Sequence, residues 1–261
     1  MVASESFPFV KKGEMAEAIE ALSRAIKRNG HDIRIILPGY KAIIDKGEYK
    51  VSSTGKKVMV DTGILKYEGE VLETKIHEDD IPVYFIESQE NFLKDELCGT
   101  SRNEYENPEE LIFFSLAVIE MVKKIDFKPD IIHCHDWYTA LLPVYLKTIY
   151  KEDDFFKSVK VTFSIYNIIY QGIYDTEKLS NARLPQYLFS NDYMGFHGKI
   201  NFMKGAIIFS DCITTVSERY KEEIQTSEFG YGLEEILKIR KDNLYGILNG
   251  IDYSVWNPAI D

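Results

Sequence analysis

Residues 201–219 read NFMKGAIIFSDCITTVSER and contain a helix, a strand and the start of a second helix in direct succession. We expect the first helix over residues 201–210 and the strand over residues 212–216. The hydroxyl of Ser217 is suited to cap a helix that opens with Glu218. Strands and helices that alternate in this way are typical of a parallel sheet covered by helices on both faces.

The alternation continues on both sides of this stretch. The expected elements, in chain order, are a helix over 108–125, a strand over 131–134, a helix over 137–150, a strand over 159–164, a helix over 233–240 and a strand over 244–248. This order predicts an α/β fold with a Rossmann-like parallel sheet. In such sheets, ligands bind beyond the carboxyl ends of the strands.

The first third of the chain carries a helix, a strand and a region of hairpins. Apolar residues at helical spacing predict a helix over 14–29, and a short apolar run predicts a strand over 32–37. Residues 48–87 alternate polar and apolar side chains, with glycines at the expected turns. We therefore expect an inserted β-hairpin region near 48–87 that ends in a strand over 83–86.

Composition and charge argue against several classes of protein. The 261 residues are 45% apolar and 28% charged, and the formal net charge is −11. The phosphates of nucleic acid and of an anionic membrane surface repel such a charge, so we expect neither as a partner. Cys98, Cys134 and Cys212 form no CxxC pair, and no signal peptide or membrane-spanning run is visible. These features predict a cytoplasmic protein.

Several motifs occur in a fixed order along the chain. They are Lys11-Lys12-Gly13, His133-Cys134-His135-Asp136-Trp137, Asn201-Phe202-Met203-Lys204-Gly205, Glu228-Phe229-Gly230-Tyr231-Gly232, Leu248-Asn249-Gly250-Ile251-Asp252 and Trp256-Asn257-Pro258. In this order they resemble the bacterial glycogen synthase and plant starch synthase family. The resemblance implies the N-terminal lobe of a GT-B glycosyltransferase. It makes residues 1–261 one catalytic domain, with the C-terminal lobe outside it.

The resemblance also implies an activity. The family transfers glucose from ADP-glucose to the non-reducing end of an α-1,4-glucan, with retention of configuration and without a metal or other cofactor. The implied partners are a nucleotide sugar, a glucan acceptor and a second lobe that stabilises the departing nucleotide. A plant member of the family would act in the plastid, although no transit peptide is visible here.

The start of the chain departs from the family's pattern. The family has a full apolar strand before a segment like Ala3-Ser4-Glu5, whereas only Met1 and Val2 precede that segment here. We therefore expect most of the first strand to be missing. A sheet without this strand would carry unpaired backbone groups along a central gap.

Lys11-Lys12-Gly13-Glu14-Met15 resembles the family's K-T-G-G-L loop. In such a loop, glycines let backbone N–H groups at a helix N-terminus approach a diphosphate, and a lysine adds positive charge. Lys11 and Gly13 match the family's lysine and first glycine, so both are candidate donor-binding residues. Glu14 replaces the second glycine. Its carboxylate repels a phosphate, although an acid also stabilises the first turn of a helix.

The segment His133-Cys134-His135-Asp136-Trp137 includes the end of an expected strand. Two histidines and a cysteine suggest a metal site. Strand alternation places the histidines on one face and the cysteine on the other, so we expect no metal. Asp136 is suited to cap the following helix. It also matches the aspartate of the family's H-D-W segment, which makes it a candidate catalytic residue that hydrogen-bonds sugar hydroxyls.

Four further positions match or depart from the family's ligand contacts. Tyr166 stands where the family has a histidine that touches the transferred glucose, and it is the second candidate catalytic residue. A tyrosine can donate a hydrogen bond, but its pKa of about 10 prevents a change of charge near neutrality. Asn167 matches a sugar-binding asparagine, and Asn249 matches one near the donor. Cys98 replaces a tyrosine that lines the sugar pocket.

These departures leave three interpretations open. The first is a catalytic lobe of a glycogen or starch synthase. The second is a degenerate paralogue that binds a glucan or a partner synthase without chemistry, because the changes at positions 14, 98 and 166 all fall at ligand positions. The third is a transferase that uses another nucleotide sugar. The glycines of residues 228–232, which match the family closely, suggest a loop beside the cleft that contacts glucan.

Overall fold

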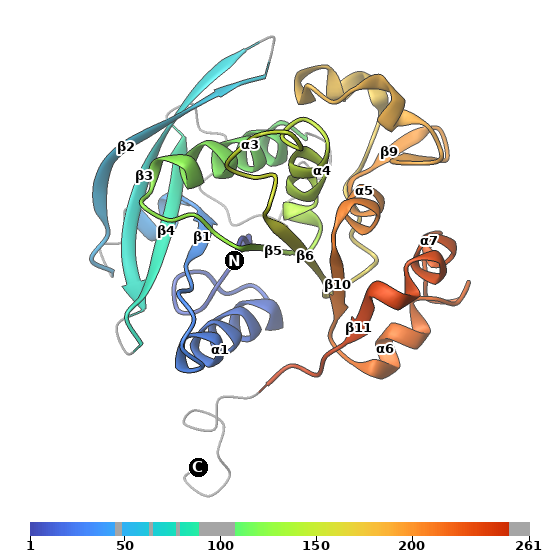
Figure 1. Cartoon of the computed structure of the whole chain (residues 1–261), viewed down its shortest axis with the longest axis horizontal. Coiled ribbons are helices and arrows are strands. Elements are labelled where there is room, and N and C mark those ends of the chain that lie inside the picture. Colours follow the sequence, from blue (N-terminus) through green and yellow to red (C-terminus); the bar gives the residue numbers. More distant parts are fainter. Residues whose placement is uncertain (45–48, 63–64, 77–78, 89–107, 251–261) are drawn as a thin grey trace, which may run out of the picture.

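The structure is a computed structural model that describes residues 1–44, 49–62, 65–76, 79–88 and 108–250. One long sheet crosses the molecule, with helices on both of its faces (Figure 1). Buried side chains from the sheet and from the helices that cover it form one continuous hydrophobic core.

One half of the sheet is parallel. Its strand order is β11-β10-β6-β5, and each neighbouring pair runs in the same direction. The strands are β5 (Ile131–His135), β6 (Lys160–Ile165), β10 (Cys212–Thr215) and β11 (Leu244–Gly246). The predicted α/β fold with a parallel sheet is therefore confirmed.

The other half of the sheet contains the hairpins. Its order is β1-β4-β3-β2, in which β1 and β4 are parallel and the other pairs are antiparallel. The strands are β1 (Ile35–Pro38), β2 (Ser52–Asp61), β3 (Lys66–Ile76) and β4 (Ile81–Ser88). The hairpins predicted near 48–87 are confirmed, and they lengthen the main sheet through β4.

Residues 1–3 lie between the two halves of the sheet. The N–H of Val2 donates to the carbonyl of His133 (2.8 Å), and the carbonyl of Val2 accepts from the N–H of His135 (3.0 Å). On its other side, the segment exchanges two hydrogen bonds with Ile36 (2.9 and 3.1 Å). The first three residues thus pair with both β5 and β1, at the position where the sequence predicted a gap in the sheet.

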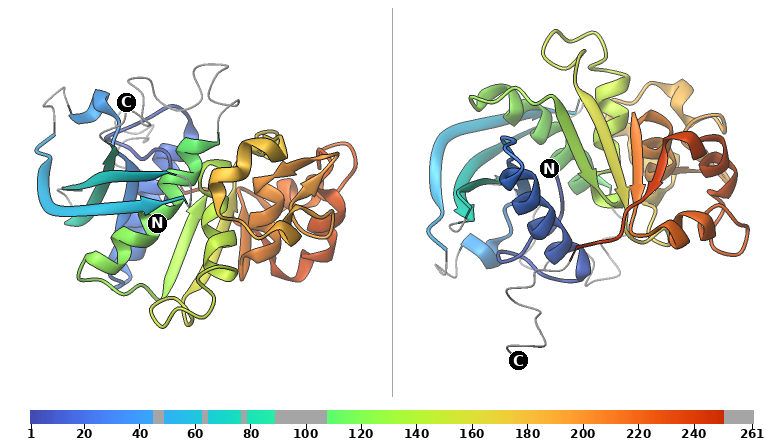
Figure 2. Two further views of the ribbon diagram at one scale, coloured as in Figure 1. Left: turned by 90° about the horizontal axis from the view of Figure 1, so that it is seen from above. Right: turned by 60° about the horizontal axis from the view of Figure 1, so that its bottom comes forward.

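Helices cover both faces of the sheet, with α3 and α4 on one face and α1 on the other (Figures 1 and 2). The longest of the described helices, α3, is charged at both ends and buried throughout its middle, from Leu111 to Ile119, where its residues are almost all apolar. The helices are α1 (Glu14–Arg28), α2 (Lys41–Ile44), α3 (Glu109–Lys124), α4 (Leu141–Lys147), α5 (Phe202–Phe209), α6 (Glu218–Glu223) and α7 (Glu234–Ile239).

The helix predicted over 137–150 is wrong in its extent. The structure has a 3₁₀ turn, η2 (Trp137–Thr139), and then the shorter helix α4. Pro143 explains the difference, because proline has no N–H to donate and is tolerated only in the first turn of a helix. It lies in the first turn of α4, so the α-helix begins close to it.

The segment between β6 and α5 contains no helix or strand that the sequence predicts. It contains two 3₁₀ helices, η3 (Thr176–Ala182) and η4 (Gln186–Phe189), and a small sheet. The strands of this sheet are β7 (Ile173–Tyr174), β8 (Gly195–Phe196) and β9 (Lys199–Asn201), in the order β7-β9-β8. Elements of two or three residues are too short to show a helical or strand period.

Candidate functional site

A pocket of about 490 Å³ opens where β5, β6 and β10 end and α1 begins, and we call it the strand-end pocket. Its walls are Ser4, Glu5, Lys12, Gly13, Glu14, Met15, Asp136, Trp137, Tyr138, Tyr166, Asn167, Tyr170, Val216 and Asn249. Five of the six candidate residues lie here: Gly13, Asp136, Tyr166, Asn167 and Asn249. The pocket lies beyond the carboxyl ends of the parallel strands, where ligands of such sheets bind.

Asp136 is the residue whose environment is most unusual. It follows β5 directly and has a positive φ of 61°. Its carboxylate accepts a hydrogen bond from the N–H of Trp137 (2.9 Å), which confirms the predicted cap. The residue is only 8% exposed, and burial raises the pKa of its carboxyl to about 7. A carboxyl with this pKa can accept hydrogen bonds from hydroxyls or share a proton near neutrality.

Tyr166 extends from the end of β6 into the same pocket. Its hydroxyl and Nδ1 of His135 are hydrogen-bonded at 3.2 Å. The ring of His135 stacks on that of His133, with centroids 4.0 Å apart, whereas Cys134 is fully buried on the other side of the strand. Burial lowers the pKa of both histidines and raises the pKa of Tyr166, so all three side chains are neutral near pH 7.

Glu5 is a pocket residue that is not among the candidates predicted from the sequence. Its carboxylate accepts hydrogen bonds from the N–H groups of Lys12 (2.5 Å) and Gly13 (3.2 Å). These are the loop amides that were expected to face a diphosphate. The chain therefore supplies its own anion at this position. The available sequence signal was an acidic residue within the mostly apolar stretch from Val2 to Val10, which also contains Ser4 and Ser6.

Lys11 does not line the pocket. Its ammonium lies 2.6 Å from the carboxylate of Glu17, on the exposed side of α1. Among the described residues that line the pocket, Glu5, Glu14 and Asp136 are acidic and Lys12 is basic. This excess of carboxylates favours ligands that donate hydrogen bonds, such as sugar hydroxyls, over phosphates.

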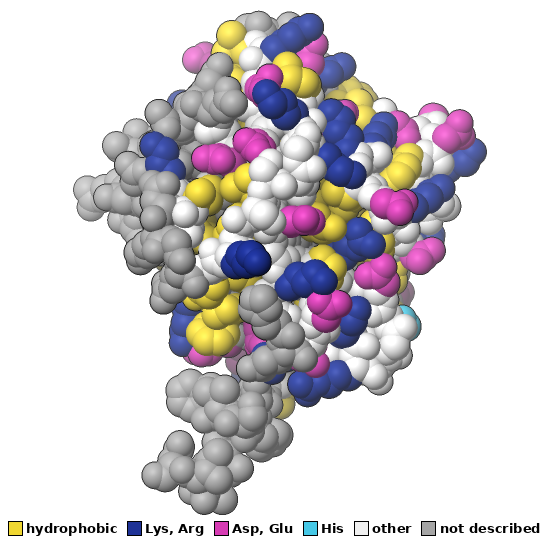
Figure 3. Space-filling view, turned by 90° about the vertical axis from the view of Figure 1, so that its left-hand side faces the viewer, with side chains coloured by type: hydrophobic (Ala, Val, Ile, Leu, Met, Phe, Trp, Pro, Cys, Tyr) yellow, Lys and Arg dark blue, Asp and Glu magenta, His cyan; other side chains and the backbone are white. Residues whose placement is uncertain are grey.

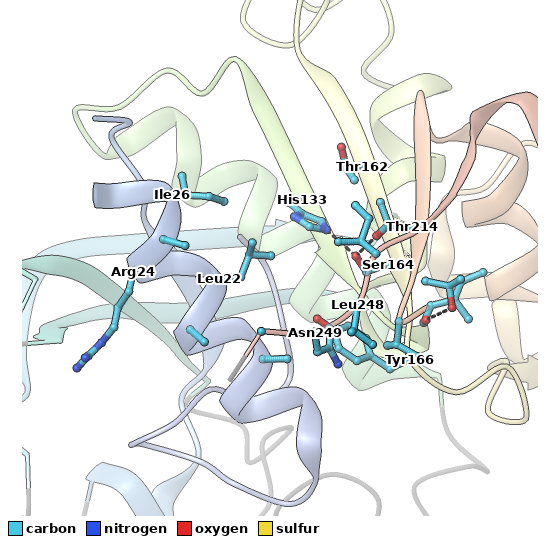
Figure 4. Close-up of a pocket in the computed structure, with 18 of the residues that line it drawn as sticks. Leu22, Arg24, Ile26, His133, Thr162, Ser164, Tyr166, Thr214, Leu248 and Asn249 are labelled. Atoms are coloured by element: carbon cyan, nitrogen blue, oxygen red, sulfur yellow. Dashed lines mark hydrogen bonds between the residues drawn. The ribbon is translucent and has the colours of Figure 1, made fainter. Parts of the chain in front are cut away.

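A larger cavity of about 740 Å³ lies between α1 and the sheet, next to the strand-end pocket. Leu22 and Ile26 point into it from α1, whereas Arg24 points away (Figure 4). On the sheet side, the Ser164 hydroxyl is hydrogen-bonded to Nε2 of His133 at 2.7 Å. Such a pair can act as nucleophile and base. Burial lowers the pKa of His133 to about 3, which makes it too weak a base for that role.

Surface charge and metal-ligating side chains add little to the site. Figure 3 shows basic and acidic side chains intermixed on one face of the molecule, so no electrostatic field of a single sign builds up there.

In the part of the chain that the structure describes, no group of three or more His, Cys, Asp or Glu side chains could hold a metal ion. No helix within the described ranges is long and apolar enough to cross a membrane.

The comparison with family models decides which family this is. The model of the starch synthase catalytic domain matches residues 1–239.

The chain belongs to this family.

Known relatives of the starch synthase family agree with this assignment. The chain is 44% identical to the glycogen synthase of Geotalea daltonii over 261 residues and 39% identical to that of Thermotoga maritima over 266 residues. Each match covers all of this chain and 53% of the relative. The chain therefore spans about half the length of the curated relatives it matches.

A solved structure of the same family has the same fold. The catalytic domain of starch synthase IV from Arabidopsis thaliana, bound to ADP and acarbose, superimposes with a TM-score of 0.90 at 32% identity. The match covers all of this chain and 53% of that one. The GT-B fold expected from the sequence is confirmed by this likeness. Cys98, one of the departures from the family's pattern, lies outside the described residues.

Replacing Glu14 by glycine is expected to tighten the binding of a nucleotide sugar about fivefold, because it removes from the wall of the pocket a carboxylate that would repel a diphosphate. Isothermal titration calorimetry of the chain with ADP-glucose measures this change. Glu218→Gly is the matched control, since it also removes an acid from the first turn of a helix but lies away from the pocket. Equal or weaker affinity of Glu14→Gly would contradict this role of Glu14.

Proposed function

We propose that this chain forms the sugar-binding half of the active site of a glucosyltransferase. The reaction is transfer of glucose from ADP-glucose to the non-reducing end of an α-1,4-glucan, without a metal or other cofactor and in the cytoplasm. A second lobe completes the site and supplies the positive charge that the departing nucleotide requires. Membership of the starch synthase family and the nature of the strand-end pocket support this proposal.

One observation carries the proposal. The strand-end pocket brings together Asp136, Tyr166, Asn167 and Asn249, which come from distant parts of the chain. They present a carboxyl, a phenol and two amides to one space. This is the set of hydrogen-bonding groups that orients a polyhydroxylated, uncharged ring. The transferred glucose therefore lies against these side chains, with its diphosphate directed away from Glu5.

The test is a chimera in which these 261 residues are joined to the part of the Geotalea daltonii enzyme that the match does not cover. We expect the chimera to add labelled glucose from ADP-glucose to maltooligosaccharides, and we expect no transfer by the chain alone. The complete Geotalea enzyme is the positive control. Transfer by the isolated chain would contradict the need for a second lobe.

The same experiment separates the other two functions. A chimera that folds and binds glucan but transfers no glucose would support a non-catalytic paralogue. In that case, the changes to Glu14 and Tyr166 at ligand positions would account for the loss of catalysis. Transfer from UDP-glucose but not from ADP-glucose would support a changed donor. Both results would contradict the proposed reaction while leaving the family and the fold unchanged.

A further inference from the structure

The turn that follows β6 places Asn167 at the wall of the strand-end pocket. Two successive backbone N–H groups in this turn each donate to a side-chain oxygen. The N–H of Ile168 donates to the hydroxyl of Tyr220 (3.1 Å), and the N–H of Ile169 donates to Oδ1 of Asn167 (3.0 Å). Tyr220 lies 52 residues further along the chain than Ile168, so its hydroxyl ties the turn to a separate element of the fold.

The hydrogen bond from Ile169 decides which group Asn167 presents to a ligand. An asparagine side chain has one oxygen, which accepts, and one NH2 group, which donates. The oxygen of Asn167 is engaged within the turn, so its NH2 group remains to donate to a ligand in the pocket. A hydrogen bond to a sugar oxygen requires a separation of about 2.7–3.2 Å. The contact therefore depends on where the turn lies.

Tyr220 gives this turn a rigid support. It belongs to α6, where its own N–H donates to the capping hydroxyl of Ser217 (2.9 Å). Its ring packs against the hydrophobic core, and burial raises the pKa of its hydroxyl, which is therefore neutral near pH 7. Tyr220 does not line the strand-end pocket. It therefore acts on a ligand in that pocket through the turn that it holds.

The same turn influences the carboxyl of Asp136. Burial raises the pKa of this carboxyl to about 7, and the backbone N–H groups of Trp137 and Asn167 oppose the rise because they stabilise the ionised form. The negative charge of Glu5 acts in the same direction as burial. The other titratable side chains in the described wall of the pocket are Lys12, Glu14, Tyr138, Tyr166 and Tyr170. A turn that moves away from Asp136 withdraws the N–H of Asn167, so the pKa of Asp136 rises further.

We propose that Tyr220 is a positioning residue for glucosyl transfer, because its hydroxyl holds the turn of residues 167–170 so that Asn167 meets the transferred glucose. The inference rests on the proposed function for the identity of the ligand. The same hold keeps the N–H of Asn167 against the carboxylate of Asp136, which is a property of the chain alone. Tyr220 thereby joins the residues that determine the rate of transfer, although it lies outside the pocket wall.

The first test uses the 261-residue chain and follows the Asp136 carboxyl by NMR, with ¹³C at the side-chain carboxyl of aspartate. Asp136→Asn identifies the signal. Tyr220→Phe removes the hydroxyl and keeps the ring in the core. We expect the pKa of Asp136 to rise by about half a pH unit in Tyr220→Phe, because the freed turn withdraws the N–H of Asn167 from the ionised carboxylate. The charged groups of the pocket wall are unchanged in this variant, so they do not cause the shift.

Tyr145→Phe is the matched control. The hydroxyl of Tyr145 is buried and donates to the carbonyl of Ala182 (2.7 Å), and Tyr145 does not line the pocket. Its loss removes a structural hydrogen bond without moving the turn. We expect Tyr145→Phe to lower the melting temperature at least as much as Tyr220→Phe and to leave the pKa of Asp136 unchanged. The positioning role is overturned if the pKa of Asp136 in Tyr220→Phe equals that in the unaltered chain.

The second test measures transfer by the chimera. Tyr220→Phe should slow transfer about fivefold, since it loosens the contact of Asn167 with the glucose. In a chimera that already carries Asn167→Ala, the same change should slow transfer by less than about twofold, since the amide that the hydroxyl positions is gone. An equal loss in both backgrounds would show that Tyr220 acts independently of Asn167, and the positioning role would be overturned.

The two tests separate this inference from the proposed function. If the chimera transfers no glucose but Tyr220→Phe raises the pKa of Asp136 in the chain, the proposed reaction fails and the hold of Tyr220 on the turn stands. If the chimera transfers glucose and Tyr220→Phe changes neither the rate nor the pKa of Asp136, the positioning role fails and the proposed function stands.

Discussion

Asp136→Asn is expected to slow glucosyl transfer by the chimera about thirtyfold, while raising the thermal stability of the chain at pH 8. The loss of rate follows from replacing a charged hydrogen-bond acceptor in the strand-end pocket by a neutral one. The gain in stability follows from burial, which raises the pKa of Asp136 to about 7 and makes its ionised form costly in the folded state. Asparagine retains an oxygen that can accept from the N–H of Trp137.

The stability effect has a defined dependence on pH. An aspartate carboxyl has an ordinary pKa of 3.8, and the fold raises the pKa of Asp136 to about 7. The folded state therefore holds the proton more tightly, and the unaltered chain loses stability as the pH rises from about 4 through about 7. The gain in melting temperature that Asp136→Asn gives over the unaltered chain should be largest above pH 7 and should vanish near pH 4. Melting temperatures measured across this range test the prediction.

Asp130→Asn is the control for this prediction, because Asp130 precedes β5, is exposed and does not line the pocket. Its effect on the melting temperature should be small at each pH. A stability difference between Asp136→Asn and the unaltered chain that stays constant from pH 4 to pH 8 would show that burial of the charge is not its cause. An unchanged transfer rate would remove Asp136 from the catalytic residues.

Gly246→Ala is expected to lower the free energy of unfolding by about 3 kcal/mol. Gly246 ends β11, and a Cβ added there would lie 2.4 Å from the Cα and N of Glu218 and from the carbonyl oxygen of Ser217. All three are backbone atoms at the start of α6, so no side chain can rotate away to make room. The strand and the helix must separate, and the packing between them is lost.

Urea unfolding followed by circular dichroism measures this loss. Gly250→Ala is the control, since a Cβ added at Gly250 meets no atom within 4 Å. Its free energy of unfolding should stay within about 0.5 kcal/mol of that of the unaltered chain. If Gly246→Ala is as stable as Gly250→Ala, the close approach of β11 to α6 does not constrain the fold.

Long elements with a clear period could be predicted from the sequence. The helices expected over 14–29 and 108–125 agree with α1 and α3 to within a residue at each end. The expected strand over 32–37 was less accurate, because β1 begins only at Ile35. Segments without a period could not be assigned, such as the short turns and strands between β6 and α5. In that region, β8 and β9 form a hairpin of very short strands, and β7 pairs with β9 from a distant part of the chain, so a local sequence pattern does not predict either pairing.

The candidate site was predictable where residues follow strands directly. Asp136 and Tyr166 follow adjacent parallel strands, so the topology alone brings them to one edge of the sheet. The role of Glu5 could not be predicted, because it depends on how the chain folds back to place its carboxylate against the amides of Lys12 and Gly13. Lys11 was expected in the pocket from the family's motif, but its ammonium instead pairs with Glu17 six residues along the chain.

The position of residues 1–3 makes this short segment the link between the two halves of the sheet. Val2 is hydrogen-bonded to His133 and His135 on one side, and Met1 and Ala3 are hydrogen-bonded to Ile36 on the other. Loss of this pairing would leave β5 and β1 without a backbone partner between them. Three residues therefore determine whether the parallel strands and the hairpins form one sheet or two.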